Sequence, residues 1–249
     1  MTGAAPGLLP VGLPAPAAGA FTTRVGGASR GPWAEGNLGL HVEDDPAAVR
    51  SNRLALAGAL GLGPDRLAFG EQVHGRGVAV VGPVPERHAV PGVDALVTRH
   101  PGVGLVMMAA DCLPVLLADP AAGVVAAAHA GRAGLADGVL QEVLSVMAGL
   151  GGRAERTTAV LGPAVCGACY ELPEELADEV GRRVPGSRTT TRQATPGVDL
   201  TAGAQTLLEA AGVSTQRVGG CTLEQPDLFF SHRRSGVTGR HAGVVWLAP

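Results

Sequence analysis

Short apolar runs of strand length form the main pattern in the middle of the chain. Near-continuous apolar runs cover residues 95–98, 103–110, 115–118 and 123–129, and shorter β-rich segments lie at 76–84, 157–161 and 242–247. Apolar runs of this length, bounded by turn residues, are typical of strands that are buried on both faces. We therefore predict a sheet-rich core.

Four amphipathic segments predict helices, at residues 47–61, 135–150, 173–184 and 200–211. Asp44-Asp45-Pro46 is a helix start signal before the first segment, and Gly212 ends the last one. Residues 21–39 are rich in turn residues. Because strands and helices are mixed without strict alternation, the pattern favours a mixed-sheet α/β or α+β fold over a barrel. No repeat or linker clearly divides the chain.

Composition narrows the class of protein. With 249 residues, 46% of them hydrophobic and 16% charged, the chain can bury a single core and is not expected to be disordered. A net charge of −3 argues against nucleic acid as the main partner. No uninterrupted apolar run reaches the roughly 18 residues of a membrane helix, and prolines interrupt the first 20 residues, which make a poor signal peptide. We expect a soluble cytoplasmic protein without a membrane partner.

Three soft metal ligands stand in three separate motifs of small residues. They are His74 in Glu-Gln-Val-His-Gly, Cys112 in Ala-Asp-Cys-Leu-Pro and His129 in Ala-Ala-His-Ala-Gly. Taken singly, each histidine would be a hydrogen-bonded structural residue, and a lone cysteine is often inert packing. Together, two imidazoles and one thiolate are the donor set of a catalytic zinc site with one open position. We predict that the three converge on a metal ion.

Asp111 interrupts an otherwise apolar run directly before Cys112. A buried carboxylate is costly unless it is paired or bound to a ligand, so this position needs a specific role. Two roles remain open: a general acid/base beside the metal, or a carboxylate that orients a ligand histidine. An anion could bind to Arg24 or to the amides at the start of the helix near Gly134.

Two further motifs are less specific. Cys166 and Cys169 have Cys-x-x-Cys spacing, which suits a redox pair or half a zinc site. No second such pair follows and the context is not thioredoxin-like, so we expect a structural turn. Residues 229–240 cluster three arginines with hydroxyl residues and glycines. This segment is either a solvated basic loop or a loop that binds a phosphate.

Short motifs along most of the chain occur in the order typical of one known family. They are Phe-Thr-Thr-Arg-Val-Gly-Gly at 21–27, Asn-Leu-Gly at 37–39, Asp-Asp-Pro at 44–46, Gln-Val-His-Gly at 72–75, Asp-Ala-Leu-Val-Thr at 94–98, Ala-Asp-Cys-Leu-Pro at 110–114, His-Ala-Gly at 129–131, Gly-Pro-Ala at 162–164, Cys-Tyr-Glu at 169–171 and Phe-Phe-Ser-His-Arg-Arg at 229–234. With these motifs the chain resembles the laccase-domain family, also called the polyphenol oxidase or multicopper-oxidase-like family. Its members are described as zinc-dependent purine nucleoside phosphorylases with adenosine deaminase activity. The resemblance leaves residues 1–20 as a variable N-terminal segment and 21–249 as the domain.

The resemblance implies a single α+β domain, a mixed β-sandwich flanked by helices, with zinc (or, as the alternative, copper) on the three ligands named above. Arg24 and Asn37 match family positions that line the active-site cleft, so the resemblance implies that both bind substrate. We predict catalytic roles for Cys112, Asp111 and Arg24. The implied reactions are phosphorolysis of adenosine, inosine or methylthioadenosine to free base and ribose 1-phosphate, and hydrolytic deamination of adenosine. Purine nucleosides and phosphate are therefore the expected partners of a monomer or small homo-oligomer.

Two departures from the family pattern lie near the expected site. The family usually reads His-Ala-Gly-Trp-Arg-Gly, whereas residues 129–134 read His-Ala-Gly-Arg-Ala-Gly, so the Trp is missing and the Arg comes one position early. The family's double Cys before Tyr is Ala168-Cys169 here. Neither departure changes an expected metal ligand.

Two other function classes stay open from the sequence. A copper-dependent phenol oxidase is disfavoured because multicopper chemistry needs more histidines than the seven present readily supply. A cysteine hydrolase acting in peptidoglycan editing would use Cys112 as nucleophile and a histidine as base. Metal analysis separates this class from the zinc enzyme.

Overall fold

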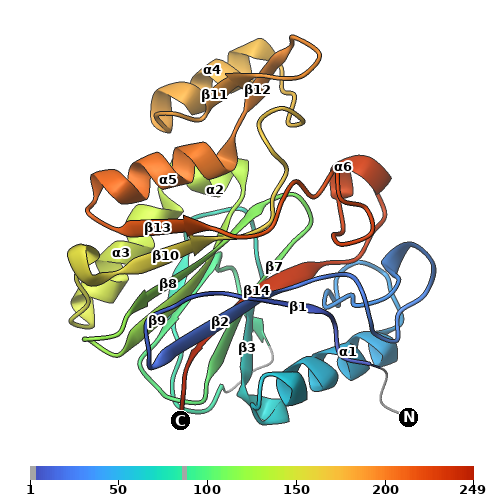
Figure 1. The fold of residues 1–249 in the computed structure, drawn as a ribbon, viewed down its shortest axis with the longest axis vertical. Helices are drawn as coiled ribbons and strands as arrows, with labels where there is room; N and C mark the ends of the chain where they lie inside the picture. The colour runs from blue at the N-terminus through green and yellow to red at the C-terminus, as the bar shows by residue number, and fades with distance from the viewer. Residues whose placement is uncertain (1–3, 86–88) are drawn as a thin grey trace.

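Two six-stranded mixed sheets stack on one another in the computed structural model, which describes residues 4–85 and 89–249 (Figure 1). The first sheet has the order β1 (Leu8–Pro10), β2 (Ala17–Thr22), β14 (His241–Leu247), β7 (Gly104–Ala109), β3 (Leu67–Gly70) and β5 (Ala89–Val90). The second has the order β13 (Ser214–Arg217), β10 (Thr158–Leu161), β8 (Leu113–Asp119), β9 (Val124–Ala130), β6 (Ala95–Thr98) and β4 (Val78–Val80). A small third sheet pairs β11 (Arg188–Thr190) with β12 (Pro196–Val198).

Helices cover the outer faces of this sandwich (Figure 1). The α-helices of the described residues are α1 (Pro46–Ala59), α2 (Arg132–Asp137), α3 (Val139–Gly149), α4 (Glu174–Arg183), α5 (Leu200–Ala210) and α6 (His232–Ser235). Single 3₁₀ turns lie at η1 (Gly31–Trp33), η2 (Pro64–Arg66) and η3 (Ala154–Arg156). Among the described residues, no helix has the length and apolar character that crossing a bilayer requires.

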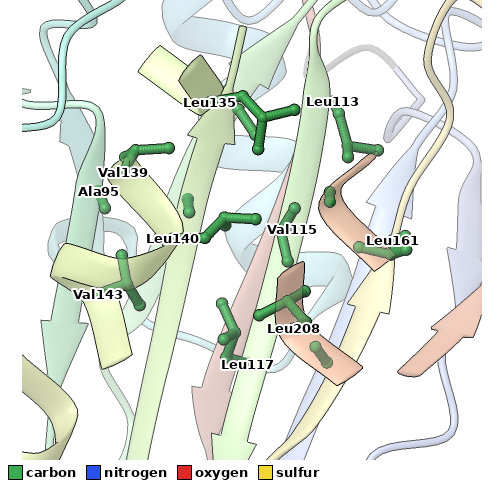
Figure 2. Packing of buried hydrophobic residues seen from close by; sticks show 14 of the residues in the cluster. Ala95, Leu113, Val115, Leu117, Leu135, Val139, Leu140, Val143, Leu161 and Leu208 are labelled. Atoms are coloured by element: carbon green, nitrogen blue, oxygen red, sulfur yellow. The ribbon is translucent and has the colours of Figure 1, made fainter. Parts of the chain in front are cut away.

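Alternation along the central strands divides the core into three layers of packing. Leu113, Val115 and Leu117 of β8 belong to the cluster that packs against α3 and α5 (Figure 2). Leu116, on the opposite face of β8, belongs to the cluster between the two sheets, together with Phe21 from β2. A third cluster packs α1 against the outer face of the first sheet. Each fully buried Leu or Phe side chain contributes roughly 1.5–3 kcal/mol to this core.

The fold class predicted from the sequence, an α+β domain with a mixed sandwich flanked by helices, is confirmed. The prediction of one helix over residues 135–150 is wrong. Two helices, α2 and α3, occupy this region, and they meet at Gly138, whose φ of +91° is left-handed. An α-helix cannot continue through a left-handed residue, so the chain bends there.

The N-terminal residues take part in the first sheet. β1 pairs with β2, and β2 pairs with β14 from the other end of the chain, with Phe21 opposite Gly243. The boundary expected between residues 20 and 21 therefore falls inside β2. That the first 20 residues are variable stays a prediction.

Candidate metal centre

The three predicted ligands meet at one end of the sandwich. The ligand atoms of His74, Cys112 and His129 all lie within 4.8 Å of one another. His129 is near the end of β9, Cys112 directly precedes β8, and β8 pairs with β9 so that Pro114 lies opposite His129. His74 comes from a bend after β3, and its ring meets the His129 ring edge-on, with centroids 4.9 Å apart.

The orientation of His129 follows from strand geometry and from one buried carboxylate. Side chains alternate along β9, so His129 extends the row of Val125 and Ala127, which face the other sheet. Its Nδ1 lies 2.8 Å from Oδ1 of Asp94, which is fully buried before β6. Because a carboxylate accepts the proton of Nδ1, Nε2 is left free to ligate a metal.

Asp94 also fixes the loop that carries His74. Its carboxylate accepts hydrogen bonds from the backbone N–H groups of His74 (2.9 Å) and Gly75 (2.7 Å), and a longer one from Val73 (3.2 Å). His74 has a φ of +61°, a left-handed conformation that a residue with a side chain adopts only when its surroundings hold it there. Sequence reasoning gave Asp94 no role, although a charged residue directly before a buried strand is the same signal that marked Asp111.

The charges of the cluster are tightly coupled. Burial alone would raise the pKa of Cys112, but the charge and hydrogen bonds of His129 and His74 outweigh it and lower this pKa to about 6. Burial opposes protonation of His129, yet the Cys112 thiolate and Asp94 raise its pKa to about 9. Burial likewise opposes ionisation of Asp94, whose pKa is nevertheless lowered by its bonds to His129 and Gly75.

The backbone of Gly131 forms the floor under the three ligands. A Cβ at this position would lie 2.9 Å from Cδ2 of His74, 3.1 Å from Sγ of Cys112 and 3.4 Å from Cε1 of His129. The absence of a side chain at Gly131 therefore allows the three donor atoms to approach one another. Converging donors with soft sulfur and imidazole chemistry fit a zinc-type ion in the catalytic pattern of three protein ligands.

Asp111 lies beside the cluster but holds other partners. Its carboxylate accepts hydrogen bonds from Oγ1 of Thr222 (2.6 Å) and from the backbone N–H of Arg233 (2.7 Å). Among the contacts of the described residues, it has no hydrogen bond to either ligand histidine. The orienting contact to a ligand histidine, one of the two roles left open for Asp111, is made by Asp94 instead.

The donor cluster opens into a cavity of about 670 Å³. Its wall combines apolar side chains with histidines and three arginines. Besides the three ligands, the lining residues are His41, Gln72, Met108, Ala109, Ala110, Asp111, Arg132, Ala133, Val165, Tyr170, Leu200, His232, Arg233 and Arg240. The Arg233 guanidinium lies 4.9 Å from the centre of the Tyr170 ring. A cavity of this size, with an apolar wall and a few converging charges, suits a small organic anion or its reaction partner. Arg132, the arginine that comes one position early in the His-Ala-Gly-Arg-Ala-Gly motif, is one of the residues of the cavity wall.

Arg24 and Asn37 are not among the residues that line this cavity. The Arg24 guanidinium donates to the carbonyl oxygens of Ala34 (2.7 and 3.0 Å) and Pro226 (3.0 Å). Asn37 is fully buried, and its Oδ1 accepts a hydrogen bond from the backbone N–H of Arg240 (2.9 Å). Asn37 thus contacts a residue of the cavity wall, Arg240.

Comparison with known proteins adds a family assignment to this geometry. The family model described as multi-copper polyphenol oxidoreductase laccase matches residues 18–248. Purine nucleoside phosphorylase ORF3 of Streptomyces griseus is 52% identical over 92% of this chain and 93% of its own, and a purine nucleoside phosphorylase of Corynebacterium glutamicum is 47% identical over 91% and 93%. The crystal structure of YlmD from Geobacillus stearothermophilus superposes with a TM-score of 0.91 at 34% identity, covering 98% of this chain and 97% of that one.

Proposed function

Because the chain belongs to the multi-copper polyphenol oxidoreductase laccase family, and relatives 47–52% identical are named purine nucleoside phosphorylases, we propose that it is a zinc-dependent purine nucleoside phosphorylase. The observation that carries the proposal is the cluster of two imidazoles and one thiol, within 4.8 Å of one another, in the wall of a cavity that also carries arginines. Zinc held by His74, Cys112 and His129 would supply a Lewis acid at one side of the substrate.

The cavity wall supports binding of both substrates. Met108, Val165 and Tyr170 offer apolar surface to a purine ring, and Arg132 and Arg233 bring positive charge to phosphate. In phosphorolysis a phosphate oxygen forms a bond to C1′ of the ribose, the bond from C1′ to the purine nitrogen breaks, and the base leaves with a proton. Arginines that hold the phosphate against the sugar reduce the entropic cost of this encounter.

Residues outside the wall act through those on it. Asn37 fixes the backbone of Arg240, and so positions a charged side chain of the cavity. Arg24 donates hydrogen bonds to the carbonyl groups of Ala34 and Pro226, and so ties together two loops that are distant in the sequence. We assign positioning roles to both, in place of the direct substrate contacts implied by the resemblance.

Hydrolytic deamination of adenosine is proposed as a second reaction of the same cavity. It rests on Asp111, which lines the cavity one residue before Cys112. Zinc deaminases pair their metal with a carboxylate that carries the proton between water and the leaving ammonia. We assign this proton transfer to Asp111, the carboxylate among the residues that line the cavity.

One observation favours a second candidate function, a cysteine hydrolase. Cys112, His129 and Asp94 are arranged as nucleophile, base and orienting carboxylate, and the pKa of Cys112 is lowered to about 6, which makes it a thiolate at neutral pH. Such an enzyme would be insensitive to chelators and inactivated by alkylation of the thiol. A multicopper oxidase finds less support, because a single cluster of two histidines and one cysteine holds one ion.

A nucleoside panel with and without phosphate tests the leading proposal. Protein purified without added metal is expected to carry zinc and to release adenine or hypoxanthine only when phosphate is present. Cys112→Ala and His74→Ala are expected to lose the ion of this site and at least about 100-fold in kcat/KM, because both remove a ligand. His100→Ala, which removes a histidine that does not line the cavity, serves as the matched control.

Two results would contradict the proposal. Base release that does not depend on phosphate would exclude phosphorolysis. Full activity after removal of the metal, together with inactivation by alkylation of Cys112, would favour the cysteine hydrolase.

A further inference from the structure

A second group of soft ligands lies apart from the cavity. Its ligand atoms, like those of the first group, all lie within 4.8 Å of one another, and none of its residues lines the cavity. We call this group the thiol cluster; its members are Cys166, Cys169, Cys221 and Glu224.

Backbone hydrogen bonds hold the two loops of the thiol cluster together. The loop after β10 turns tightly at the Cys-x-x-Cys motif, where the N–H of Cys169 donates to the carbonyl of Cys166 (2.9 Å). Ala164 and Cys221 form an isolated parallel β-bridge, and the N–H of Cys166 donates to Sγ of Cys221 (3.4 Å). A third cysteine, 55 positions away along the chain, is thereby fixed at the Cys-x-x-Cys turn.

The three thiols and the carboxylate are in direct contact and hold no disulfide. The Sγ of Cys169 donates a hydrogen bond to Glu224 (3.3 Å), and the four cysteines of the chain are all free. A divalent ion at this position would bind the cysteines as thiolates, because ligation displaces the thiol protons.

Arg192 offsets part of the negative charge of the thiol cluster. It forms an ion pair with Glu224 and lies 3.8 Å from Sγ of Cys169. Three thiolates and a carboxylate around a divalent ion carry net negative charge, and a neighbouring guanidinium offsets it. Since a carboxylate has two oxygens, Glu224 can contact the arginine with one and an ion with the other.

We propose that the thiol cluster is a second metal site that binds zinc with four protein ligands. Thiolate-rich sets select thiophilic ions over magnesium or calcium. A site whose four positions are all taken by protein is structural, in contrast to the first cluster, which keeps one position open. The Cys-x-x-Cys spacing supplies two ligands from one turn, as in many structural zinc sites.

The ion would stabilise one wall of the cavity. Tyr170, which lines the cavity, directly follows Cys169, and its N–H donates to the carbonyl of Cys166 (3.0 Å). Thr222, which donates to the Asp111 carboxylate, directly follows Cys221. Loss of the ion would therefore loosen the positions of Tyr170 and Asp111 without removing either side chain.

Metal quantitation on separate variants tests the second site independently of any activity. Wild-type protein, purified under reducing conditions without added metal or chelator, is expected to carry two zinc ions per chain. Cys112→Ser empties the first site and is expected to retain one ion, and Cys169→Ser, a conservative change of a half-buried side chain, is also expected to retain one. The double variant is expected to retain none, with circular dichroism confirming that each variant is folded.

X-ray absorption at the zinc edge identifies the ligands of the remaining ion. In Cys112→Ser protein the ion is expected to have three sulfur neighbours and one oxygen; if this variant does not fold, His74→Ala, at an exposed ligand, replaces it. A Cys112→Ser or His74→Ala protein that holds no zinc would overturn the proposal. So would zinc that persists in the double variant, or a disulfide among the three cysteines found by mass spectrometry of the wild-type protein.

Discussion

Gly131 determines how closely the three ligands of the first cluster approach. Its backbone, with φ −69° and ψ 165°, is a conformation that alanine adopts without strain, so the only obstacle to a side chain is the Cβ itself. That atom would lie 2.9 Å from the His74 ring and 3.1 Å from the Cys112 sulfur. We expect Gly131→Ala to fold and to bind zinc at this cluster at least about 10-fold more weakly, as measured by competition with a chelator.

Gly58→Ala is the matched control for this change. Gly58 lies in α1, where an added Cβ would meet no atom within 4 Å. Its zinc affinity is expected to equal that of the wild-type protein. An unchanged zinc affinity in Gly131→Ala would show that the three ligands can move apart without a free-energy cost. The close contacts around Gly131 would then have no role in zinc binding.

Single residues differ in how far the sequence reveals them. The donor atoms of His74, Cys112 and His129 are a property of residue type, so the first cluster could be predicted. The role of Asp94 could not, because it depends on three backbone N–H groups that only the folded loop brings together. Cys221 was missed for the same reason: its partners are 55 positions away and a β-bridge joins them.

Gly138 is the decisive residue at the scale of elements. It ends α2 and begins α3 with φ +91° and ψ 33°. Alanine in this conformation places its Cβ against the backbone, so we expect Gly138→Ala to lower the free energy of unfolding by about 1–2 kcal/mol, measured by urea denaturation. Gly149→Ala, in the same α3 helix with no atom near the added Cβ, is expected to leave it unchanged or raise it by up to ~1 kcal/mol. Equal effects of both changes would refute this explanation of the helix break.

The elements that the sequence predicted are those with long apolar patterns. β7, β8 and β9 are six or seven residues long and buried throughout, so their apolar runs are visible without neighbours. β13, with the sequence Ser-Thr-Gln-Arg, is largely exposed and exists because it pairs in parallel with β10. The helix break at Gly138 was missed because the apolar period of α2 continues into α3, so only the glycine marks it.

The stacking of the whole molecule depends on pairings that no local pattern contains. Within the first sheet β2 pairs with β14, so residues near the two ends of the chain become neighbours. The inner side chains of each sheet are buried only when the two sheets stack. Leu116 of β8 in the second sheet, for example, packs in one cluster with Phe21 of β2 and Leu105 of β7 in the first. Sequence periodicity predicts that a strand has two buried faces, but it does not predict which element covers each face.

His241 links the stability of the whole molecule to pH. It begins β14, is fully buried, and packs against Phe229 with ring centroids 5.4 Å apart. Neither ring nitrogen has a hydrogen-bond partner among the described residues. Burial therefore lowers the pKa of His241 from 6.5 to about 4. The imidazole ring of His241 is neutral in the folded protein at pH 7. In acid, the ring must be protonated while it is buried in the core, which costs stability.

The sign of the pH effect follows from this lowered pKa. As the pH falls below 6.5, the unfolded chain takes up a proton at His241 before the folded protein does, so stability is lost until the pH passes the folded pKa near 4. At about 1.4 kcal/mol for each pKa unit, the loss is roughly 3 kcal/mol.

We expect His241→Phe to keep its stability at pH 7, because no hydrogen bond is removed, and to gain roughly 3 kcal/mol over the wild-type protein between pH 7 and pH 4. Urea unfolding at several pH values measures this gap, with His100→Phe, at a partly exposed histidine, as the control that follows the wild-type curve. Parallel curves for His241→Phe and the wild-type protein would show that this ring is not the source of acid sensitivity.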